Sequence, residues 1–171
     1  MYKRQIENCS VSGSVSGTNC VGGVVGSQKA GSIIGCSSSA IVKGTRYVGG
    51  VAGEKWGTMT ACYATGNVTL EIDSPKNLSG GGLVGFNGGS SVLACYATGN
   101  VTSTGSSTGN VHIGGFLGDN YTTVTACYWK NNHEQGIGYN KKSTGATKVD
   151  GTDVTWQKAV DAMNTALQNA G

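Results

Sequence analysis

Six cysteines are the residues of this sequence best suited to bind a metal or to form disulfides. They are Cys9, Cys20, Cys36, Cys62, Cys95 and Cys127. Structural zinc sites usually contain closely spaced cysteine pairs such as C-x-x-C. The nearest pair in this chain, Cys9 and Cys20, is much farther apart. We therefore expect no metal site and no cofactor.

Paired carboxylates could support glycoside hydrolysis, and two candidates occupy equivalent positions. Glu54 and Asp119 each follow a glycine motif, and Phe86 holds the same position between them. An inverting glycosidase needs two carboxyl groups at most about 9.5 Å apart with a water between them, and a phenyl ring occupies that place. His133 and Glu134 lack the second histidine of a zinc-peptidase helix. The residues predict no enzyme.

Internal repeats are the elements that would position such residues. Two glycines, two apolar residues and a third glycine recur from Gly22, Gly49, Gly81 and Gly114, and five of the cysteines follow the same rhythm. The sequence Ala-Cys-Tyr-Ala-Thr-Gly-Asn-Val-Thr occurs twice, at residues 61–69 and 94–102. Units of this size cannot bury their own apolar face, so they must stack.

Each repeat contains two short segments with the alternating pattern of a β-strand. Around the cysteine, we expect the small or apolar residues at even offsets to face inward, whereas the neighbouring tyrosine faces outward. This inward set is Leu93, Cys95, Ala97, Gly99 and Val101. In the glycine segment, alternation places Leu117 on the side opposite Phe116.

We predict an all-β fold, a parallel β-solenoid (β-helix) of about four to five coils, with coils about 4.8 Å apart. A β-sandwich also has regularly spaced strands, but it does not require the same residue type to return in every coil. Stacking places Cys36, Cys62, Cys95 and Cys127 in one internal column. Parallel Cβ bonds keep their Cβ atoms farther apart than the usual distance of about 3.8 Å in a disulfide, so we expect free, buried thiols.

The C-terminal stretch has a helical pattern instead. Trp156, Val160, Met163 and Leu167 form one stripe, with Thr155 or Asp153 as the N-cap. We predict solenoid repeats over residues 1–130, a connector loop over 131–152 and an amphipathic helix over 153–171. The helix is expected to cap the apolar end of the last coil, and docking of a further domain is the alternative.

Composition and charge exclude several classes of partner. The 171 residues carry 12 basic and 9 acidic side chains, a net charge of +3 that is too small and scattered to indicate nucleic-acid binding. No apolar run is long enough to insert into a membrane. The first residues do not resemble a signal peptide, so we expect either a cytosolic protein or a piece of a longer secreted chain.

Residues 82–85, Gly-Leu-Val-Gly, are preceded by glycine and followed by a Cys-Tyr-Ala-Thr-Gly segment. This combination resembles the GLUG-motif repeat of bacterial surface and secreted proteins, which include adhesin-like proteins and non-catalytic parts of immunoglobulin-A-directed peptidases. The resemblance covers roughly residues 9–129 and is strongest over 62–127. It implies an extracellular or cell-surface location and a modular, adhesive role, and it carries no catalytic residues.

Two surfaces are candidates for ligand binding. All variation in repeat length falls within residues 69–78 and 102–111, which would bulge side by side from one edge and would present Glu71, Asp73 and Lys76. Tolerated surface length is the alternative. The second candidate is an outward row of tyrosines that suits a sugar ring or a protein partner, unless it is only a stabilising ladder. Its members are Tyr63, Tyr96 and Tyr128, extended by Trp129.

The sequence thus predicts a non-enzymatic module of a bacterial cell-surface or secreted protein, built for cell adhesion or display. A host protein or glycan is the expected partner, together with further domains of a longer chain. The alternative is a carbohydrate-binding or accessory module of a larger surface enzyme that processes peptides or glycosides. A purely structural stalk without any ligand is a third possibility.

Overall fold

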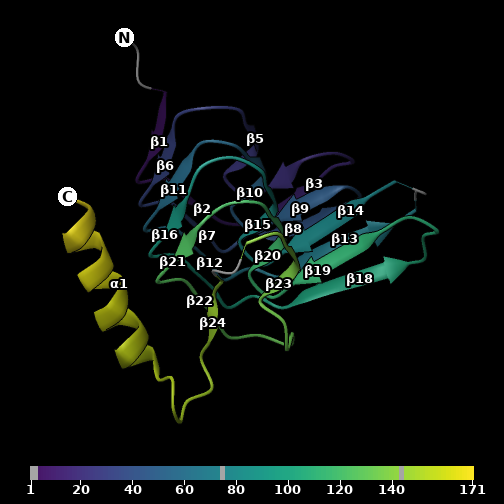
Figure 1. Cartoon of the computed structure of the whole chain (residues 1–171). Coiled ribbons are helices and arrows are strands. Elements are labelled where there is room, and N and C mark those ends of the chain that lie inside the picture. The colour runs from purple at the N-terminus through teal and green to yellow at the C-terminus, as the bar shows by residue number, and fades with distance from the viewer. Residues whose placement is uncertain (1–3, 74–75, 143–144) are drawn as a thin grey trace.

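The computed structural model describes residues 4–73, 76–142 and 145–171. Within them the chain winds as a parallel β-solenoid of four coils, and every coil passes through the same five sheets in the same order (Figure 1). All strand pairs among the described residues are parallel and in register. The fold prediction is confirmed. The predicted segments also include residues 1–3, 74–75 and 143–144, which lie outside the described residues.

Three sheets enclose the main body of the solenoid. Sheet A contains β1 (Gln5–Glu7), β6 (Ser32–Ile34), β11 (Thr58–Thr60), β16 (Val92–Leu93) and β21 (Val124–Thr125). Sheet B contains β2 (Ser10–Val11), β7 (Ser37–Ser38), β12 (Tyr63–Ala64), β17 (Tyr96–Ala97), β22 (Tyr128–Trp129) and β24 (Thr147–Lys148). Sheet E contains β5 (Val25–Gln28), β10 (Ala52–Lys55), β15 (Val84–Asn87), β20 (Leu117–Asn120) and β23 (Ile137–Asn140).

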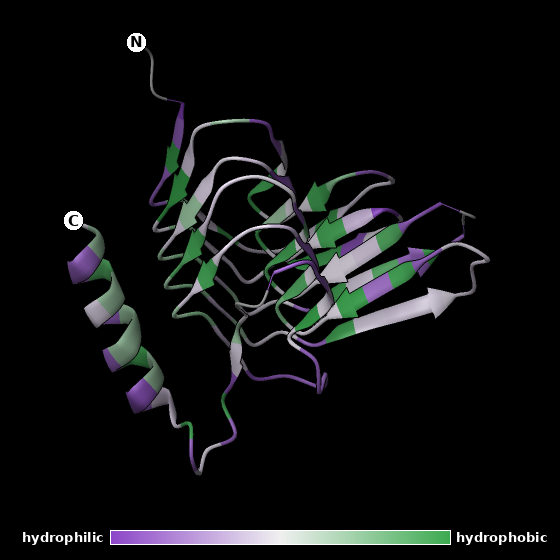
Figure 2. Cartoon of the chain, viewed as in Figure 1, coloured by the Kyte–Doolittle hydropathy of each residue, from purple (hydrophilic) through white to green (hydrophobic). Residues whose placement is uncertain are grey.

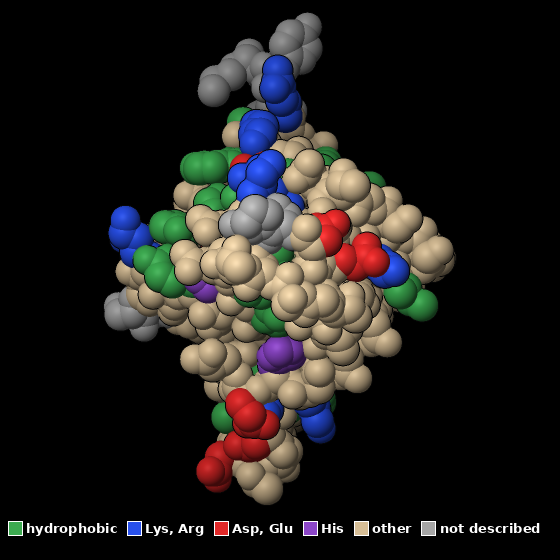
Figure 3. All heavy atoms as spheres, turned by 90° about the vertical axis from the view of Figure 1, so that its right-hand side faces the viewer, with side chains coloured by type: hydrophobic (Ala, Val, Ile, Leu, Met, Phe, Trp, Pro, Cys, Tyr) green, Lys and Arg blue, Asp and Glu red, His purple; other side chains and the backbone are tan. Residues whose placement is uncertain are grey.

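The other two sheets form a flat wing that projects from this body on the side away from the helix (Figure 1). Sheet C contains β3 (Ser14–Ser16), β8 (Ile41–Gly44), β13 (Val68–Ile72) and β18 (Val101–Gly105), and sheet D contains β4 (Val21–Gly22), β9 (Tyr47–Gly49), β14 (Leu78–Gly81) and β19 (Val111–Gly114). The body and the wing have separate apolar cores, and apolar segments follow one another from coil to coil in both (Figure 2). Figure 3, which views the wing side, shows a surface made mostly of uncharged groups.

The cysteine column is present as predicted. Cys36, Cys62, Cys95 and Cys127 are free and buried, and the backbone N–H of Cys95 donates to Sγ of Cys127 at 3.4 Å. Burial raises the pKa of the Cys95 thiol well above its usual value, which keeps this group protonated and unreactive.

The predicted alternation breaks at two corners of each coil. Ala94, just before the cysteine, has a φ of 51°, so the chain turns between sheets A and B. Val92 therefore points into the core in place of Leu93, which is only half-buried. At the second corner, between sheets D and E, Phe116 and Leu117 are both fully buried. The expectation that these two residues face opposite sides was wrong, because the glycine segment is a corner and not a continuous strand.

The glycine pairs allow this corner to stack on itself. A Cβ atom on Gly82 would lie 2.2 Å from the carbonyl oxygen of Gly115 in the next coil and 3.0 Å from Cβ of Ala97. Each coil rests directly on the backbone of its neighbour at this point, so the position has no room for a side chain. This steric demand accounts for the recurrence of glycine in the sequence.

The end of the solenoid is not closed by the helix. Helix α1 (Trp156–Ala170) begins after the N-cap Thr155, as predicted, but it lies along the flank of the coils beside β16 (Figure 1). Ala159 and Met163 are its buried residues, whereas Val160 is 41% exposed. The expectation of a capping helix was wrong because the chain turns back along the coils before the helix starts.

The predicted connector performs the closing role. Instead of forming only a loop, residues 131–152 contain β23 and β24, which add to sheets E and B. The side chain of Asn132 donates to the carbonyl of Val101 at 2.9 Å and accepts from its N–H at 3.0 Å. His133 Nε2 also contacts that carbonyl at 2.9 Å. These polar groups satisfy the edge of β18, the last strand of sheet C.

Candidate functional site

The tyrosine row faces outward, as predicted from the inward cysteines. Tyr63 pairs in register with Tyr96, and Tyr96 with Tyr128. The rings of Tyr63 and Tyr96 are parallel, with centroids 4.8 Å apart and an angle of 2° between their planes. In this arrangement neighbouring rings cover each other's faces, and Tyr63 is the most exposed member at 38%.

Helix α1 covers part of this row. Trp156 meets the ring of Tyr96 edge-on at 5.5 Å, and the two residues line a groove of about 340 Å³ together with Thr65, Thr98, Val160 and Met163. Trp129 does not extend the row, because it is 6% exposed and packs in the body core. Its indole N–H donates to the carbonyl of His133 at 3.2 Å. The expectation that Trp129 enlarges an exposed platform was wrong, since alternation along β22 turns it inward next to the outward Tyr128.

The two insertions lie side by side in the wing, as predicted. β13 pairs with β18 along five residues, and Glu71 lies opposite Thr104. Glu71 forms an exposed ion pair with Lys43 at 2.7 Å. Asp73 and Lys76 line a pocket of about 320 Å³ at the turns that join sheets C and D, and Arg46 also lines it. Glu71 does not line this pocket, so the three predicted residues do not form one site.

A larger aromatic cluster lies on the outer face of sheet E, where it meets sheet D. Phe86 is at its centre, with ring centroids 5.0 Å from Tyr47, 5.8 Å from Trp56 and 5.5 Å from Tyr121. Tyr121 in turn lies 5.7 Å from Tyr139. We call these five residues the aromatic surface. They come from the second, third and fourth coils and from β23, and Trp56 and Tyr139 are each 40% exposed.

The rings of the aromatic surface are tilted against each other by 36° to 47°. Gly88 lies between the neighbouring Trp56 and Tyr121, and a Cβ there would come within 2.5 Å of the Phe86 ring and 3.0 Å of the Trp56 ring. A side chain at this position would displace the rings. Because Gly88 has no side chain, the neighbouring rings can pack into one continuous apolar surface.

Two carboxylates lie in the same column as Phe86, in the register Glu54, Phe86, Asp119 that the sequence predicts. Glu54 accepts from Lys29 at 2.5 Å, Ser27 at 2.8 Å and the indole N–H of Trp56 at 2.8 Å. Burial tends to raise the pKa of Glu54, but these hydrogen bonds outweigh it and lower the pKa to about 2. The ionised carboxylate thereby fixes the position of Trp56.

Asp119 joins a serine and a histidine, a set of residues that also occurs in hydrolases. Ser79 Oγ donates to Oδ2 of Asp119 at 2.5 Å, and His112 Nδ1 contacts Oδ1 at 2.6 Å. In a catalytic triad the histidine lies between the serine and the aspartate and takes the serine proton. Here the aspartate occupies the middle, so this arrangement does not activate Ser79 as a nucleophile. The His112 ring instead stacks on Tyr139 at 5.1 Å.

Two cations lie over rings of the aromatic surface. The Arg46 guanidinium is 4.7 Å from the centroid of Tyr47, and the Lys141 ammonium is 5.7 Å from that of Tyr121. Among the described residues neither cation forms an ion pair with a carboxylate. The register of Glu54, Phe86 and Asp119 could be predicted from the sequence, but this surface was not predicted. The signal was the pair Trp56 and Tyr121, which share one register two coils apart, together with Tyr139 in register with Asp119.

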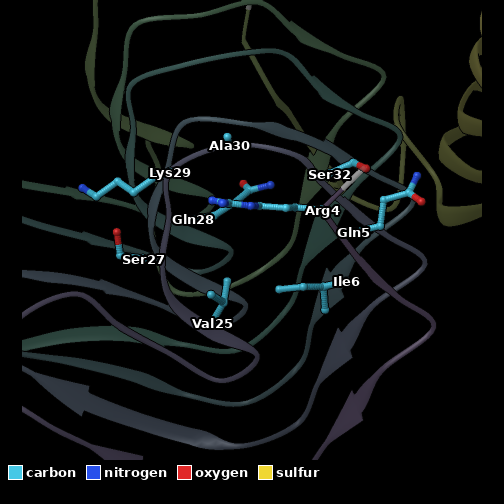
Figure 4. Close-up of a pocket in the computed structure, with 9 residues that line it drawn as sticks. All are labelled: Arg4, Gln5, Ile6, Val25, Ser27, Gln28, Lys29, Ala30 and Ser32. Carbon is cyan, nitrogen blue, oxygen red and sulfur yellow. The ribbon is translucent and has the colours of Figure 1, made fainter. Parts of the chain in front are cut away.

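A cavity of about 580 Å³ lies at the opening of the first coil (Figure 4). Ile6 and Val25 line it together with polar residues, among them Arg4 and Gln28. It is the interior of the solenoid seen from its N-terminal end. Among the described residues, no group of three or more His, Cys, Asp or Glu side chains is placed to hold a metal ion.

The fold and its repeated corner define this protein as a repeat-built parallel β-solenoid. Residues 77–102 match the GLUG motif, and this match spans one coil from the glycine strand β14 to the start of β18. The chain thus carries a GLUG motif, which is typical of secreted and surface proteins and of non-catalytic modules. No curated protein and no solved structure matches the chain. No helix among the described residues is long and apolar enough to span a membrane.

Proposed function

We propose that this chain is a non-enzymatic recognition module for cell adhesion or display at a bacterial cell surface or in a secreted protein. The observation that carries the proposal is the aromatic surface. Five rings from successive coils lie on the outside of a rigid scaffold, and two of them, Trp56 and Tyr139, remain 40% exposed. Large aromatic side chains on an exterior are characteristic of interaction sites.

The expected partner is a host protein or a glycan, and further domains of a longer chain would carry the module. The aromatic surface is better suited to this role than the predicted tyrosine row. Its rings are tilted, and two of them are exposed, whereas Tyr63 and Tyr96 are stacked on each other and α1 lies against Tyr96. The insertions border the same side of the molecule, since Arg46, Asp73 and Lys76 share one pocket.

A binding array of host extracellular proteins and glycans tests this function. We expect the purified chain to bind a ligand and the Trp56→Ala/Tyr139→Ala variant to lose at least about tenfold in affinity, because each ring contributes about 1 kcal/mol or more. Tyr63→Ala is the matched control, since it removes an equally exposed ring elsewhere. Loss of binding only in the Tyr63 variant would move the site to the tyrosine row. Absence of any ligand would favour a stalk.

A further inference from the structure

We propose that the aromatic surface binds an anionic polysaccharide, a chain of pyranose sugars that bear carboxylate or sulfate groups. This inference rests on the proposed function and specifies its ligand. Three features of the surface carry it: the spacing of its rings, the orientation of their faces and the sign of its uncompensated charge.

The distance between coils matches the repeat length of a chain of pyranose sugars. Residues at equivalent positions in adjacent coils are about 4.8 Å apart, which is comparable with the length of one pyranose unit in an extended chain. The positions in register with Trp56 are Gly88, Tyr121 and Lys141 in the following coils. A sugar chain laid along the solenoid axis would therefore meet Trp56, then Phe86 through the gap at Gly88, and then Tyr121.

The orientation of the rings favours stacking with sugars. The rings around Phe86 are tilted by 36° to 46° and do not lie face to face. Part of each face thus remains available to the apolar face of a pyranose ring. In the parallel pair of Tyr63 and Tyr96, with 2° between the ring planes, each ring covers one whole face of the other.

The charge of the surface favours an anion. Glu54 is compensated by Lys29. Asp119 is held by Ser79 and His112, which do not cancel its formal charge, and it is only 4% exposed. Arg46 and Lys141 have no such ion pair among the described residues, and they lie at opposite ends of the row of rings. Asp73 and Lys76, next to Arg46 in the pocket, contribute one charge of each sign. The two unpaired cations therefore outnumber the one buried carboxylate, Asp119, and the surface carries a small net positive charge.

The test uses three hexasaccharides of matched length: a sulfated heparin fragment, a hyaluronan fragment that carries only carboxylates, and neutral cellohexaose. Calorimetric titration at low and high salt would give their affinities. We expect at least one anionic probe to bind more tightly than cellohexaose and to weaken with salt. The Arg46→Gln/Lys141→Gln variant, which keeps all the rings, should lose about five- to thirtyfold in affinity for that probe.

The Lys130→Gln/Lys158→Gln variant is the control, since it removes the same charge from exposed positions outside the aromatic surface. An equal loss in this control would overturn the proposal, because it would show that only net charge matters. If cellohexaose binds more tightly than both anionic probes, the proposal is overturned. It is also overturned if the aromatic surface binds a protein ligand and no glycan. Either result would still agree with the adhesive function. If neither a glycan nor a protein binds anywhere, both proposals fail. Circular dichroism spectra and thermal unfolding would verify that all variants are folded.

Discussion

The tyrosine row and the aromatic surface are built from the same repeats but present their rings in opposite ways. Tyr63 and Tyr96 hold identical positions in adjacent coils, so their rings stack in parallel at 4.8 Å. The rings around Phe86 come from different positions and are therefore tilted. When the same aromatic residue recurs at one position in adjacent coils, its rings stack on one another. Variation within the repeat leaves ring faces free for a partner, and this is where a repeat protein can acquire specificity.

Both regions depend on the close stacking of coils, so the largest effect should come from a substitution that disturbs it. In Gly82→Ala the new Cβ would lie 2.2 Å from a backbone carbonyl that cannot move independently. We expect a loss of about 3 kcal/mol or more in the free energy of unfolding. Urea denaturation would measure it. Gly145→Ala is the control, because its Cβ would meet nothing closer than 3.7 Å, and equal stability of the two variants would contradict the stacking argument.

The next largest effect separates the two regions directly. Phe86→Ala removes contacts with three rings and should cost about 2 kcal/mol of stability, less than a fully buried phenylalanine because Phe86 is only half-buried. Tyr96→Ala removes one stacked ring and one edge contact and should cost about 1 kcal/mol. Chemical denaturation of both variants gives the comparison. A reversed order would show that the tyrosine row is the stronger structural element.

The repeated elements of the fold could be predicted from the sequence because they obey one physical demand in every coil. The glycine pair and the cysteine column are fixed by close backbone approach and by inward alternation. The aromatic surface could not be found in the same way. Trp56 and Tyr121 share one position two coils apart, and Phe86 occupies a different position in the coil between them. Only the register and the corner between sheets D and E bring these rings together.

The end of the solenoid was mispredicted for a related reason. An amphipathic stripe shows that a helix packs against something, but it does not show which surface it covers. The outcome depends on the path of residues 131–155, where the repeat pattern fades. Asn132 caps the edge of β18, and α1 lies along the flank beside β16. Lys55 illustrates the same limit: it is fully buried, and its ammonium donates to the carbonyls of Gly57 and Ser90 at 2.6 Å, which no local pattern indicates.

Removal of the helix sharpens the comparison, because it uncovers the tyrosine row and leaves the aromatic surface unchanged. A chain that ends at residue 152 should keep its β-type circular dichroism and lose about 1 kcal/mol of stability, since few core residues contact α1. Nitration of Tyr96 by tetranitromethane should become severalfold faster. Asn132→Ala in the full chain should cost about 1.5 kcal/mol, because the N–H of Val101 loses its partner and its C=O keeps only the contact with His133. If the truncated chain failed to fold, the helix would be essential for the stability of the solenoid, as a cap would be.

The smallest effect concerns acid, which should loosen the aromatic surface and spare the tyrosine row. The pKa of Glu54 is about 2 in the folded chain against 4.5 for the free side chain, so its ionised form stabilises the fold above pH 4.5. This contribution is lost as the pH falls from about 4.5 to about 2. Because Lys29 is 69% exposed, solvent screening limits the contribution to about 1 kcal/mol.

Urea denaturation between pH 6 and pH 2.5 should show this loss in the native chain, and Glu54→Gln should lack it. The indole N–H signal of Trp56, which donates to Glu54, should shift over the same range in nuclear magnetic resonance spectra, whereas the ring signals of Tyr63 should stay constant. Parallel shifts of both signals would mean that acid acts on the whole solenoid and that the two surfaces are not independent.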